Sequence, residues 1–409
     1  MYHLIRGLSA HRRVDILTLA EPTPESRAAV EGLRREVASW GAGGRVEAVE
    51  HSLNRAGAAW RAIVRGHSFY QTLYSSRAYQ KALDTMLGAT PYDVVQVEFA
   101  YMAQYRRSGR QAEPPRVLDE HNVEFRINAT LAADRASGAG ALRRLAYDLY
   151  ARREFAHRRT EELEACRSAD HVLTVSEPDH AVLGEAIPGL PVTVVPNGVD
   201  LAHFRAVPTA ETDTGVVFVG KMDYRPNVRA AVWFCEEILP MIRRTRPECA
   251  VTIVGAHPTP AVRALERIPG VTVTGAVGDT RPYVSRAAVT VVPIRAGSGT
   301  RLKILEALAL GRAVVSTTAG CEGIDVVDGE HLLIADEPGR FARQVDRLLG
   351  DVAERARLGA AGRRLVEAKY GWDAAVATVE RVYRAVARTT ATRPFSRDHR
   401  PGALAGVAP

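Results

Sequence analysis

The stretch that decides the fold is residues 289–310, which read VTVVPIRAGSGTRLKILEALAL. The run Val289–Ile294 is nearly all apolar, as a strand buried on both faces of a parallel sheet must be. A glycine-rich turn follows this run, and a helix-like segment begins near Thr300. This order of strand, turn and helix predicts one βα unit of an α/β domain.

The same alternation extends over the second half of the chain. Apolar, β-branched runs predict further strands at Gly215–Gly220, Ala250–Gly255, Val271–Gly275, Ala313–Thr318 and His331–Ala335. The segments between them predict helices at Asn227–Arg246, Pro260–Arg267, Asp279–Arg286, Thr300–Leu310 and Gly339–Leu349. Strands that alternate with helices form right-handed βαβ units, so we expect a doubly wound parallel sheet.

The first half repeats this pattern less clearly. Its strand candidates are Val14–Leu19, Val46–Val49, Val94–Phe99, Arg116–Asp119, Val172–Val175 and Val192–Val195. A long charged stretch, Ala141–Cys166, predicts one long helix. The chain opens with a helix-like segment, Met1–Ala10, that runs directly into the first strand candidate. A doubly wound domain normally begins with a buried strand and a glycine-rich turn, and we expect both to be missing here.

These patterns predict the following domain organisation. A Rossmann-like domain at residues 1–200 is followed by a polar linker at 201–214 and a second Rossmann-like domain at 215–370. A last helix at 371–388 comes next, and the tail at 389–409 has no periodicity and is expected to be disordered.

Composition excludes several classes of protein. The chain has 409 residues, of which 46% are apolar and 25% charged, so a disordered, collagen-like or disulfide-rich protein is excluded. No run approaches the ~18 apolar residues of a membrane span, and the start has no signal-peptide core. The four cysteines (Cys166, Cys235, Cys249 and Cys321) have no metal-ligand spacing and are expected to be buried, reduced thiols.

The net charge of +7 rests on 50 Arg and only four Lys. A basic surplus can favour nucleic acid, anionic lipid or acidic substrates. No nucleic-acid recognition motif accompanies the surplus, so we do not expect a nucleic-acid partner.

The glycine-rich turn is the first candidate binding site. Free N–H groups at a helix N-terminus attract anions, and small residues let a phosphate approach the backbone. Two basic side chains and a carboxylate follow the glycines, at the carboxyl end of a strand where open α/β sheets bind ligands. The alternative is an ordinary βα turn with a solvated basic pair. The candidate residues are Gly297, Ser298, Gly299, Thr300, Arg301, Lys303 and Glu306.

Three further side chains follow predicted strands. Lys221 comes directly after Gly215–Gly220 and could hold a phosphate as a point charge, although a solvated lysine in a surface turn is the alternative. His121 lies in the polar run Asp119–Glu124, where a structural histidine is the alternative. Glu98 ends the strand candidate before it. We expect these side chains to face the same cleft.

Together these residues resemble a family-4 GT-B retaining glycosyltransferase (group 1). The resemblance rests on Val175-Ser176, the turn Pro196-Asn197-Gly198-Val199-Asp200, Gly220-Lys221, and the turn that leads to Lys303 and Glu306-Ala307. It covers nearly residues 1–388. It is closest to the branch associated with exopolysaccharide and exosortase-linked gene clusters.

The resemblance implies two Rossmann-like domains that face each other across a cleft, and transfer of a sugar from a nucleotide diphosphate sugar to an acceptor hydroxyl. The family's paired glutamates fall on Ser298 and Glu306, so only the ribose-binding one is present. Its first basic diphosphate-binding residue falls on Lys221. Its second falls on Pro226, which leaves that role open to Arg225, Arg301 or Lys303. Its cleft histidine falls on His121. The expected catalytic residues are therefore His121, Lys221 and Lys303. Asn197 and Glu98 join the turn residues as expected substrate-binding residues.

The resemblance leaves some alternatives open. No metal or other cofactor is expected, because basic side chains and helix N-termini would neutralise the diphosphate. A nucleotide-sugar 2-epimerase on the same fold, or a non-catalytic sugar-nucleotide-binding homologue, remains an alternative. The acceptor is expected to be a saccharide or a lipid-linked saccharide, and the location cytoplasmic. The basic helix Leu142–Arg159 leaves open peripheral contact with the inner face of the membrane. The sequence is silent on oligomeric state.

Overall fold

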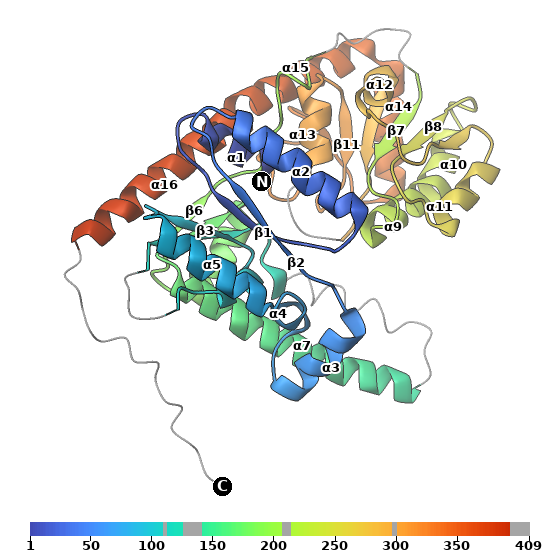
Figure 1. The fold of residues 1–409 in the computed structure, drawn as a ribbon. Helices are drawn as coiled ribbons and strands as arrows, with labels where there is room; N and C mark the ends of the chain where they lie inside the picture. Colours follow the sequence, from blue (N-terminus) through green and yellow to red (C-terminus); the bar gives the residue numbers. More distant parts are fainter. Residues whose placement is uncertain (109–112, 126–140, 207–213, 297–300, 393–409) are drawn as a thin grey trace.

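The computed structural model describes residues 1–108, 113–125, 141–206, 214–296 and 301–392. All strand pairs in these residues are parallel, and helices cover the sheets on both sides (Figure 1). This is the predicted α/β architecture, and the predicted fold class is confirmed.

The C-terminal half is built on a six-stranded sheet in the order β12-β11-β10-β7-β8-β9. Its strands are β7 (Val216–Val219), β8 (Val251–Val254), β9 (Val271–Val273), β10 (Val289–Val292), β11 (Val314–Ser316) and β12 (Leu333–Ile334). The two central strands, β10 and β7, pair with Val289 opposite Val216. All four residues of β10 are buried, which is why this run carries no charged side chain.

The flanking elements follow the expected alternation. They are α9 (Arg225–Trp233), the π-helical turn η2 (Phe234–Ile238), α10 (Leu239–Ile242), α11 (Pro260–Ala264), η3 (Leu265–Arg267), α12 (Arg281–Arg286), α13 (Leu302–Ala309), α14 (Pro338–Gly350) and α15 (Val352–Lys369). The sheet and these helices share one large hydrophobic core.

The N-terminal half contains two separate parallel sheets. A two-stranded sheet pairs β1 (Ile16–Ala20) with β2 (Val46–Glu50). A four-stranded sheet in the order β3-β4-β5-β6 contains β3 (Val95–Glu98), β4 (Arg116–Glu120), β5 (His171–Thr174) and β6 (Val192–Val194). Every residue of β1 and of β3 is only half-buried, whereas β4 is buried throughout. Among the described residues, β1 and β3 therefore each lie at the edge of a sheet.

Helices of the N-terminal half connect and cover these sheets. They are α1 (Tyr2–Ser9), α2 (Pro24–Ser39), α3 (Arg55–Arg65), α4 (Phe69–Leu73), α5 (Arg77–Ala89), the 3-10 turn η1 (Ala100–Gln104), α7 (Ala141–Ser168) and α8 (Glu177–Ala186). Helix α5 contacts both strands of the small sheet, and the Tyr79 hydroxyl donates to the Leu17 carbonyl of β1.

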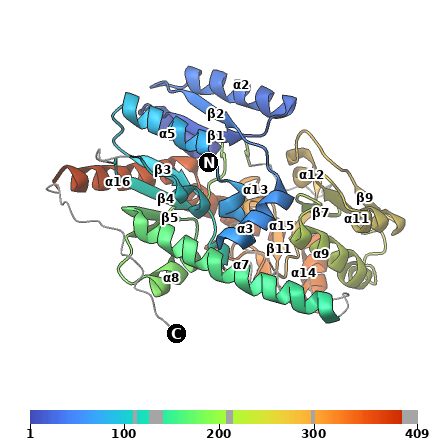
Figure 2. The same cartoon turned by 60° about the horizontal axis from the view of Figure 1, so that its bottom comes forward.

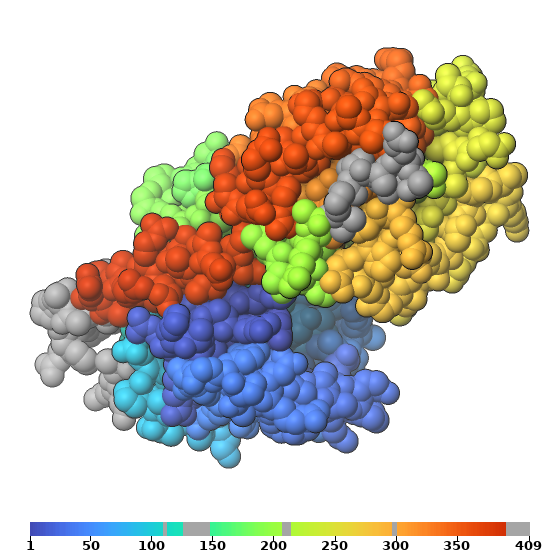
Figure 3. Space-filling view, turned by 90° about the horizontal axis from the view of Figure 1, so that it is seen from above, coloured from blue at the N-terminus to red at the C-terminus, as the bar shows by residue number. Residues whose placement is uncertain are grey.

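The last helix, α16 (Trp372–Thr392), runs back from the C-terminal half onto the N-terminal half (Figure 3). It packs against α1, where a Cβ on Gly7 would lie 2.4 Å from Val376. Leu4 and Leu8 of α1 share a core with Val379 and Val382 of α16. The C-terminal helix thus completes the core of the N-terminal half.

Two sequence predictions need correction, and one helix was missed. The helix expected at Asn227–Arg246 is interrupted by the π turn and ends at Ile242. Helix α15 was not predicted, since its mixture of Ala, Gly and Arg shows no clear apolar stripe. The disordered tail was expected from residue 389, but α16 continues to Thr392 because the first helix breaker, Pro394, comes later. Residues 393–409 lie outside the described ranges, as do 207–213 of the expected linker.

Candidate active site

The C-terminal part of the candidate site lies where strands of the large sheet end. Gly220 directly follows β7, and α13 begins at Leu302, after β10. The predicted binding residues Gly297, Ser298, Gly299 and Thr300 lie outside the described residues.

Lys303, in the first turn of α13, reaches back to the end of β7. Its Nζ atom donates a 2.8 Å hydrogen bond to Oδ1 of Asn227 on α9 and lies 4.7 Å from the centre of the Phe218 ring. Burial, with a smaller contribution from the charge of Arg301, lowers the pKa of Lys303 to about 7. A lysine with such a pKa can take up a proton when an anion binds beside it.

Gly220 makes this contact possible. A Cβ at this position would lie 2.7 Å from Nδ2 of Asn227 and 2.8 Å from Nζ of Lys303. Any side chain here would push the lysine and the amide apart. The close approach of Asn227 and Lys303 therefore explains why a glycine stands at position 220. The sequence alone did not reveal this reason.

Arg301 and Glu306 flank Lys303. Arg301 is buried, and burial lowers the pKa of its guanidinium. Glu306 is half-buried, and burial raises the pKa of its carboxyl, although the charges of Lys303 and His203 oppose this shift. The structure thus brings together three of the predicted residues and adds His203, which the sequence analysis missed.

Lys221 lies apart from this buried group. Its side chain is 63% exposed and forms a 3.4 Å ion pair with Asp223. The Lys221 carbonyl accepts a 2.9 Å hydrogen bond from Nδ2 of Asn227, so the backbone is fixed while the ammonium group stays in solvent. In the structure, the Lys221 side chain therefore has the position of a solvated lysine in a surface turn.

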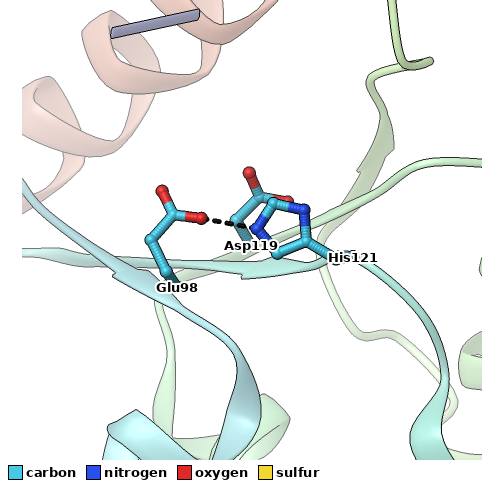
Figure 4. Close-up of side chains that lie close together, drawn as sticks. All are labelled: Glu98, Asp119 and His121. Atoms are coloured by element: carbon cyan, nitrogen blue, oxygen red, sulfur yellow. Dashed lines mark hydrogen bonds and ion pairs between the residues drawn. The ribbon is translucent and has the colours of Figure 1, made fainter. Parts of the chain in front are cut away.

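The N-terminal part of the candidate site lies where β3 and β4 end (Figure 4). His121 Nε2 lies 2.6 Å from Oε2 of Glu98, so the ring N–H donates to the carboxylate. Burial opposes the charged imidazole, but the Glu98 hydrogen bond and the charge of Asp119 outweigh it, so the pKa of His121 is raised. Burial, together with the nearby Glu98 charge, raises the pKa of Asp119 to about 7. Asp119 and His121 therefore influence each other's protonation.

A hydrogen-bond chain connects this group to α16. Gln96 Nε2 donates to Oε1 of Glu98 at 2.7 Å and more weakly to Asp119 Oδ2 at 3.4 Å. The Tyr383 hydroxyl of α16 donates to the side-chain amide oxygen, Oε1, of Gln96. Neither Gln96 nor Tyr383 was a sequence candidate, because 287 residues separate them in the chain.

The turn after β4 is held by a second carboxylate. Oε1 of Glu162 accepts from the backbone N–H of Glu124 at 2.8 Å, and Oε2 accepts from that of Phe125 at 3.0 Å. Burial raises the pKa of Glu162 to about 8, even though these two hydrogen bonds favour the charged form. The loop that carries His121 is thereby tied to α7.

Within the part of the chain that the structure describes, Glu98, Asp119 and His121 could also hold a metal ion, since each offers one donor atom within 4.8 Å of the others. In this arrangement the Glu98 oxygen and the His121 nitrogen instead engage each other at 2.6 Å. Two groups that share a proton must lose it before they can coordinate one ion. The observed geometry is that of a hydrogen-bonded pair.

A stack of aromatic rings extends from His121 and was missed by the sequence analysis. Phe99 has a φ of 69°, a left-handed conformation that is strained for a bulky residue. This conformation places its ring 4.5 Å from His121 and 5.2 Å from Tyr101, and Tyr101 stacks on Tyr74 at 4.6 Å. The strain is typical of a functional site, but φ angles cannot be read from a sequence.

A pocket of about 110 Å³ lies beside this stack. Its wall includes Tyr70, Phe99, Tyr101, Glu124 and Arg158, and the Arg158 guanidinium lies 4.4 Å from the centre of the Tyr70 ring. Aromatic faces combined with a few polar groups are typical of small-molecule sites.

Asn197, the remaining sequence candidate, is half-buried in the segment that joins the two halves. The next residue, Gly198, packs on Trp372, where a Cβ would lie 2.7 Å from the indole ring. The Val199 N–H donates to the Tyr370 carbonyl at 2.8 Å. These contacts fix the backbone just after Asn197 against the start of α16.

Two further expectations concern the chain as a whole. All four cysteines are buried and none forms a disulfide, as expected. Within the described ranges, none of the helices combines the length and the hydropathy needed to span a bilayer.

Comparisons with known proteins agree with this geometry. Residues 1–203 match the family model "Glycosyltransferase Family 4", and residues 213–351 match "Glycosyl transferases group 1". The chain spans 36% and 64% of the lengths of two curated relatives that it matches. The longer match, over 58% of this chain, is 25% identical to the phosphatidyl-myo-inositol mannosyltransferase of Propionibacterium freudenreichii subsp. shermanii.

Solved structures support the fold. The sucrose-phosphate synthase of Thermosynechococcus elongatus aligns with 92% of this chain and 100% of its own, at a TM-score of 0.60 and 18% identity. Anabaena HepE in complex with UDP aligns with 91% of this chain and 100% of its own, at a TM-score of 0.58 and 12% identity. With two α/β halves, parallel sheets and both family models matched, this chain belongs to the group 1, family 4 glycosyltransferases of GT-B fold.

Proposed function

We propose that this protein transfers a sugar from a nucleotide diphosphate sugar to an acceptor hydroxyl, with retention at the anomeric carbon. Family membership supports the reaction class. The relative from Propionibacterium is a mannosyltransferase, and the HepE neighbour binds UDP. The base and the sugar of the donor are to be found by a screen of nucleotide sugars.

The observation that carries this proposal is the position of Lys303 and Glu306 on α13. Both side chains are half-buried on consecutive turns of a helix that follows the glycine-rich segment in the sequence, and the lysine ammonium lies over Phe218 of β7. In the proposed complex the donor diphosphate lies beside Lys303. Glu306 accepts hydrogen bonds from the two ribose hydroxyls.

The proposed chemistry needs charge stabilisation at the leaving group. The bond between the anomeric carbon and the diphosphate oxygen breaks, and a bond to the acceptor oxygen forms on the same face of the sugar. The acceptor proton passes to the departing diphosphate, which leaves as the nucleotide. Lys303 and Arg301 stabilise the negative charge as it develops. Lys221 joins them in the proposed complex by turning its exposed side chain away from Asp223. Because these cations carry the neutralisation, the proposal includes no metal.

On the facing half, His121 is proposed to contact the transferred sugar. The hydrogen bond to Glu98 fixes the ring orientation and raises the pKa, so the imidazolium form persists to higher pH. In that form Nδ1 also carries a proton and can donate to a sugar hydroxyl.

The acceptor is proposed to enter over the N-terminal half. The pocket beside Tyr70 and Tyr101 offers aromatic faces and carboxylates to a saccharide, free or lipid-linked. The pathway we propose is bacterial exopolysaccharide or glycoconjugate synthesis, in the cytoplasm or at the inner face of the membrane. A matching test is Tyr101→Leu, which should raise the acceptor KM and leave donor affinity unchanged.

Donor binding tests the central assignment. Isothermal calorimetry with a series of nucleotide diphosphate sugars compares the wild type with Glu306→Ala, and Glu330→Ala serves as the control because that side chain is 61% exposed on the surface. We expect the Glu306 variant to lose affinity for the donor and the control to retain it. Unchanged affinity of Glu306→Ala for every donor would overturn the proposal.

The carboxylates near His121 favour a second candidate, a nucleotide-sugar 2-epimerase. Glu98 and Asp119 lie beside one imidazole, and an epimerase needs such groups to move a proton at C2 of the sugar. The two reactions separate when donor is incubated without acceptor. An epimerase releases nucleotide and an altered sugar under these conditions, whereas the transferase leaves the donor largely intact.

A further inference from the structure

Helix α3 (Arg55–Arg65) is attached to the protein through its small residues. Two residues of this helix, Ala58 and Ala62, are fully buried. The guanidinium of Arg153, on α7, donates to the carbonyls of Ala62 and Ile63 at 2.9 Å and 3.2 Å, and so closes the C-terminal end of α3. Both views of the ribbon show α3 beside α7 (Figures 1 and 2).

The opposite face of α3 presents large apolar side chains to solvent. Trp60 is 69% exposed, Ile63 48% and Val64 65%. Their spacing of three and four residues places them on one stripe of the helix. Helices of soluble proteins normally turn this stripe toward the core, so α3 has the reverse orientation. Leu149 of α7, one turn before Arg153, is 60% exposed as well.

The charged side chains of α3 itself are all positive. Arg55, Arg61 and Arg65 are exposed on α3, and the helix contains no acidic residue. An apolar stripe that includes Trp and is flanked by arginines is the pattern of a helix that lies in the interface of an anionic membrane.

From these observations we propose that α3 docks on the surface of an anionic lipid bilayer, with Trp60, Ile63 and Val64 inserted between the headgroups. The charge complementarity selects this occupant, because the arginines that border the stripe face the phosphates of the bilayer surface. The inference does not depend on the transfer reaction, since the surface lies outside the donor site.

The docking element is therefore α3 rather than the basic stretch Leu142–Arg159 that the sequence indicated. Two arginines of that stretch are engaged inside the protein. Arg153 binds the α3 carbonyls, and Arg158 forms ion pairs with Glu124 and Glu154. Through Arg153, helix α7 thus supports the docking helix.

Vesicle binding tests this proposal. The full chain is mixed with vesicles of phosphatidylcholine with or without phosphatidylglycerol, and the bound fraction is measured by co-sedimentation. We expect binding to the anionic vesicles only, weakening as salt is raised. The variant Trp60→Ser/Ile63→Ser/Val64→Ser should bind at least about tenfold more weakly, since burying three such side chains exceeds the ~1.4 kcal/mol that tenfold represents.

Two controls localise the effect. Val327→Ser changes a side chain that is 50% exposed in the C-terminal half, and it should bind vesicles like the wild type. Tryptophan fluorescence should shift to shorter wavelength on binding, and Trp60→Phe should remove the shift while binding persists. Because all substituted side chains are exposed, the variants should fold normally.

Three results would overturn the inference. The first is wild-type protein that does not bind anionic vesicles at low salt. The second is a triple variant that binds as tightly as the wild type, which would assign binding to another basic surface. The third is concentration-dependent dimerisation that the triple variant abolishes, without vesicle binding, which would make this face a contact between two copies of the chain.

Discussion

Lys303 and Asn227 are joined by a 2.8 Å hydrogen bond between two helices whose contacting residues lie 76 positions apart in the chain. The bond passes over Gly220, which leaves no room for a side chain. It couples the loop after β7 to the helix after β10, the two segments that the proposed function assigns to the donor.

The first prediction is that Gly220→Ala reduces donor affinity by about tenfold or more. The new methyl group would lie 2.8 Å from Lys303 Nζ, so the lysine must move away from the proposed diphosphate position. Calorimetry with the donor measures the loss. Gly278→Ala is the control, because a Cβ there meets nothing within 4 Å, and its affinity should equal that of the wild type. Equal affinities for both variants would contradict the prediction.

The second prediction is that donor binding takes up a proton at about pH 8, where a lysine of pKa about 7 is mostly neutral. A bound diphosphate stabilises the ammonium form, so the pKa of Lys303 rises and a proton enters from solution. The slope of binding enthalpy against buffer ionisation enthalpy reports this uptake.

Lys303→Met should abolish that slope as well as weaken binding. Lys221→Met is the matched variant, since its ammonium group is exposed and ion-paired with Asp223. Its slope should match that of the wild type even where its affinity falls. A wild-type slope of zero would remove Lys303 from the proposed role.

Much of the fold could be predicted from the sequence because the signals are local. The buried strands of the large sheet are continuous β-branched runs, as at Val289–Val292. Such runs are typical of strands that are buried on both faces of a parallel sheet. Helix α15 lacks a comparable local signal, because its sequence shows no clear apolar stripe. Its start was nevertheless readable, since Asp351 caps the helix by accepting from the Glu354 N–H, a spacing typical of a capping box.

The candidate site could be predicted only in part, for a related reason. Glu98 and His121 each follow a strand, and neighbouring parallel strands end at the same edge of a sheet, so sequence reasoning nominated both. Gln96 and Tyr383 act through a contact across the whole chain, which no local pattern encodes. The outward face of α3 was missed because periodicity locates an apolar stripe but not the direction in which it points.

The third prediction concerns the pH dependence of the reaction. Glu98 raises the pKa of His121 through their hydrogen bond, so Glu98→Gln should lower it, while the amide oxygen still accepts from the ring. If the imidazolium is the active form, activity is present below this pKa and lost above it. The basic limb of kcat/KM should therefore move to lower pH in the variant.

Asp93→Asn is the control for this shift, because Asp93 is exposed just before the same strand. Its pH profile should overlay that of the wild type. A Glu98→Gln profile that also overlays the wild type would show that His121 does not act as the imidazolium.

The fourth prediction is that Tyr383→Phe impairs catalysis from a position outside the substrate. Loss of the hydroxyl leaves the side-chain amide oxygen of Gln96 without this donor. The free energy of unfolding should therefore fall by about 1–2 kcal/mol. The Gln96 amide then holds Glu98 less firmly, and His121 loses its fixed orientation. We expect kcat to fall several-fold with an unchanged donor Kd, since the contacts proposed for the donor diphosphate and ribose lie in the other half. Val386→Ala, which trims a buried apolar side chain of the same helix, should lose similar stability but keep kcat. Equal kcat losses in the two variants would mean that Tyr383 contributes only to packing. A normal kcat in Tyr383→Phe would show that the hydrogen-bond chain from α16 to His121 does not affect catalysis.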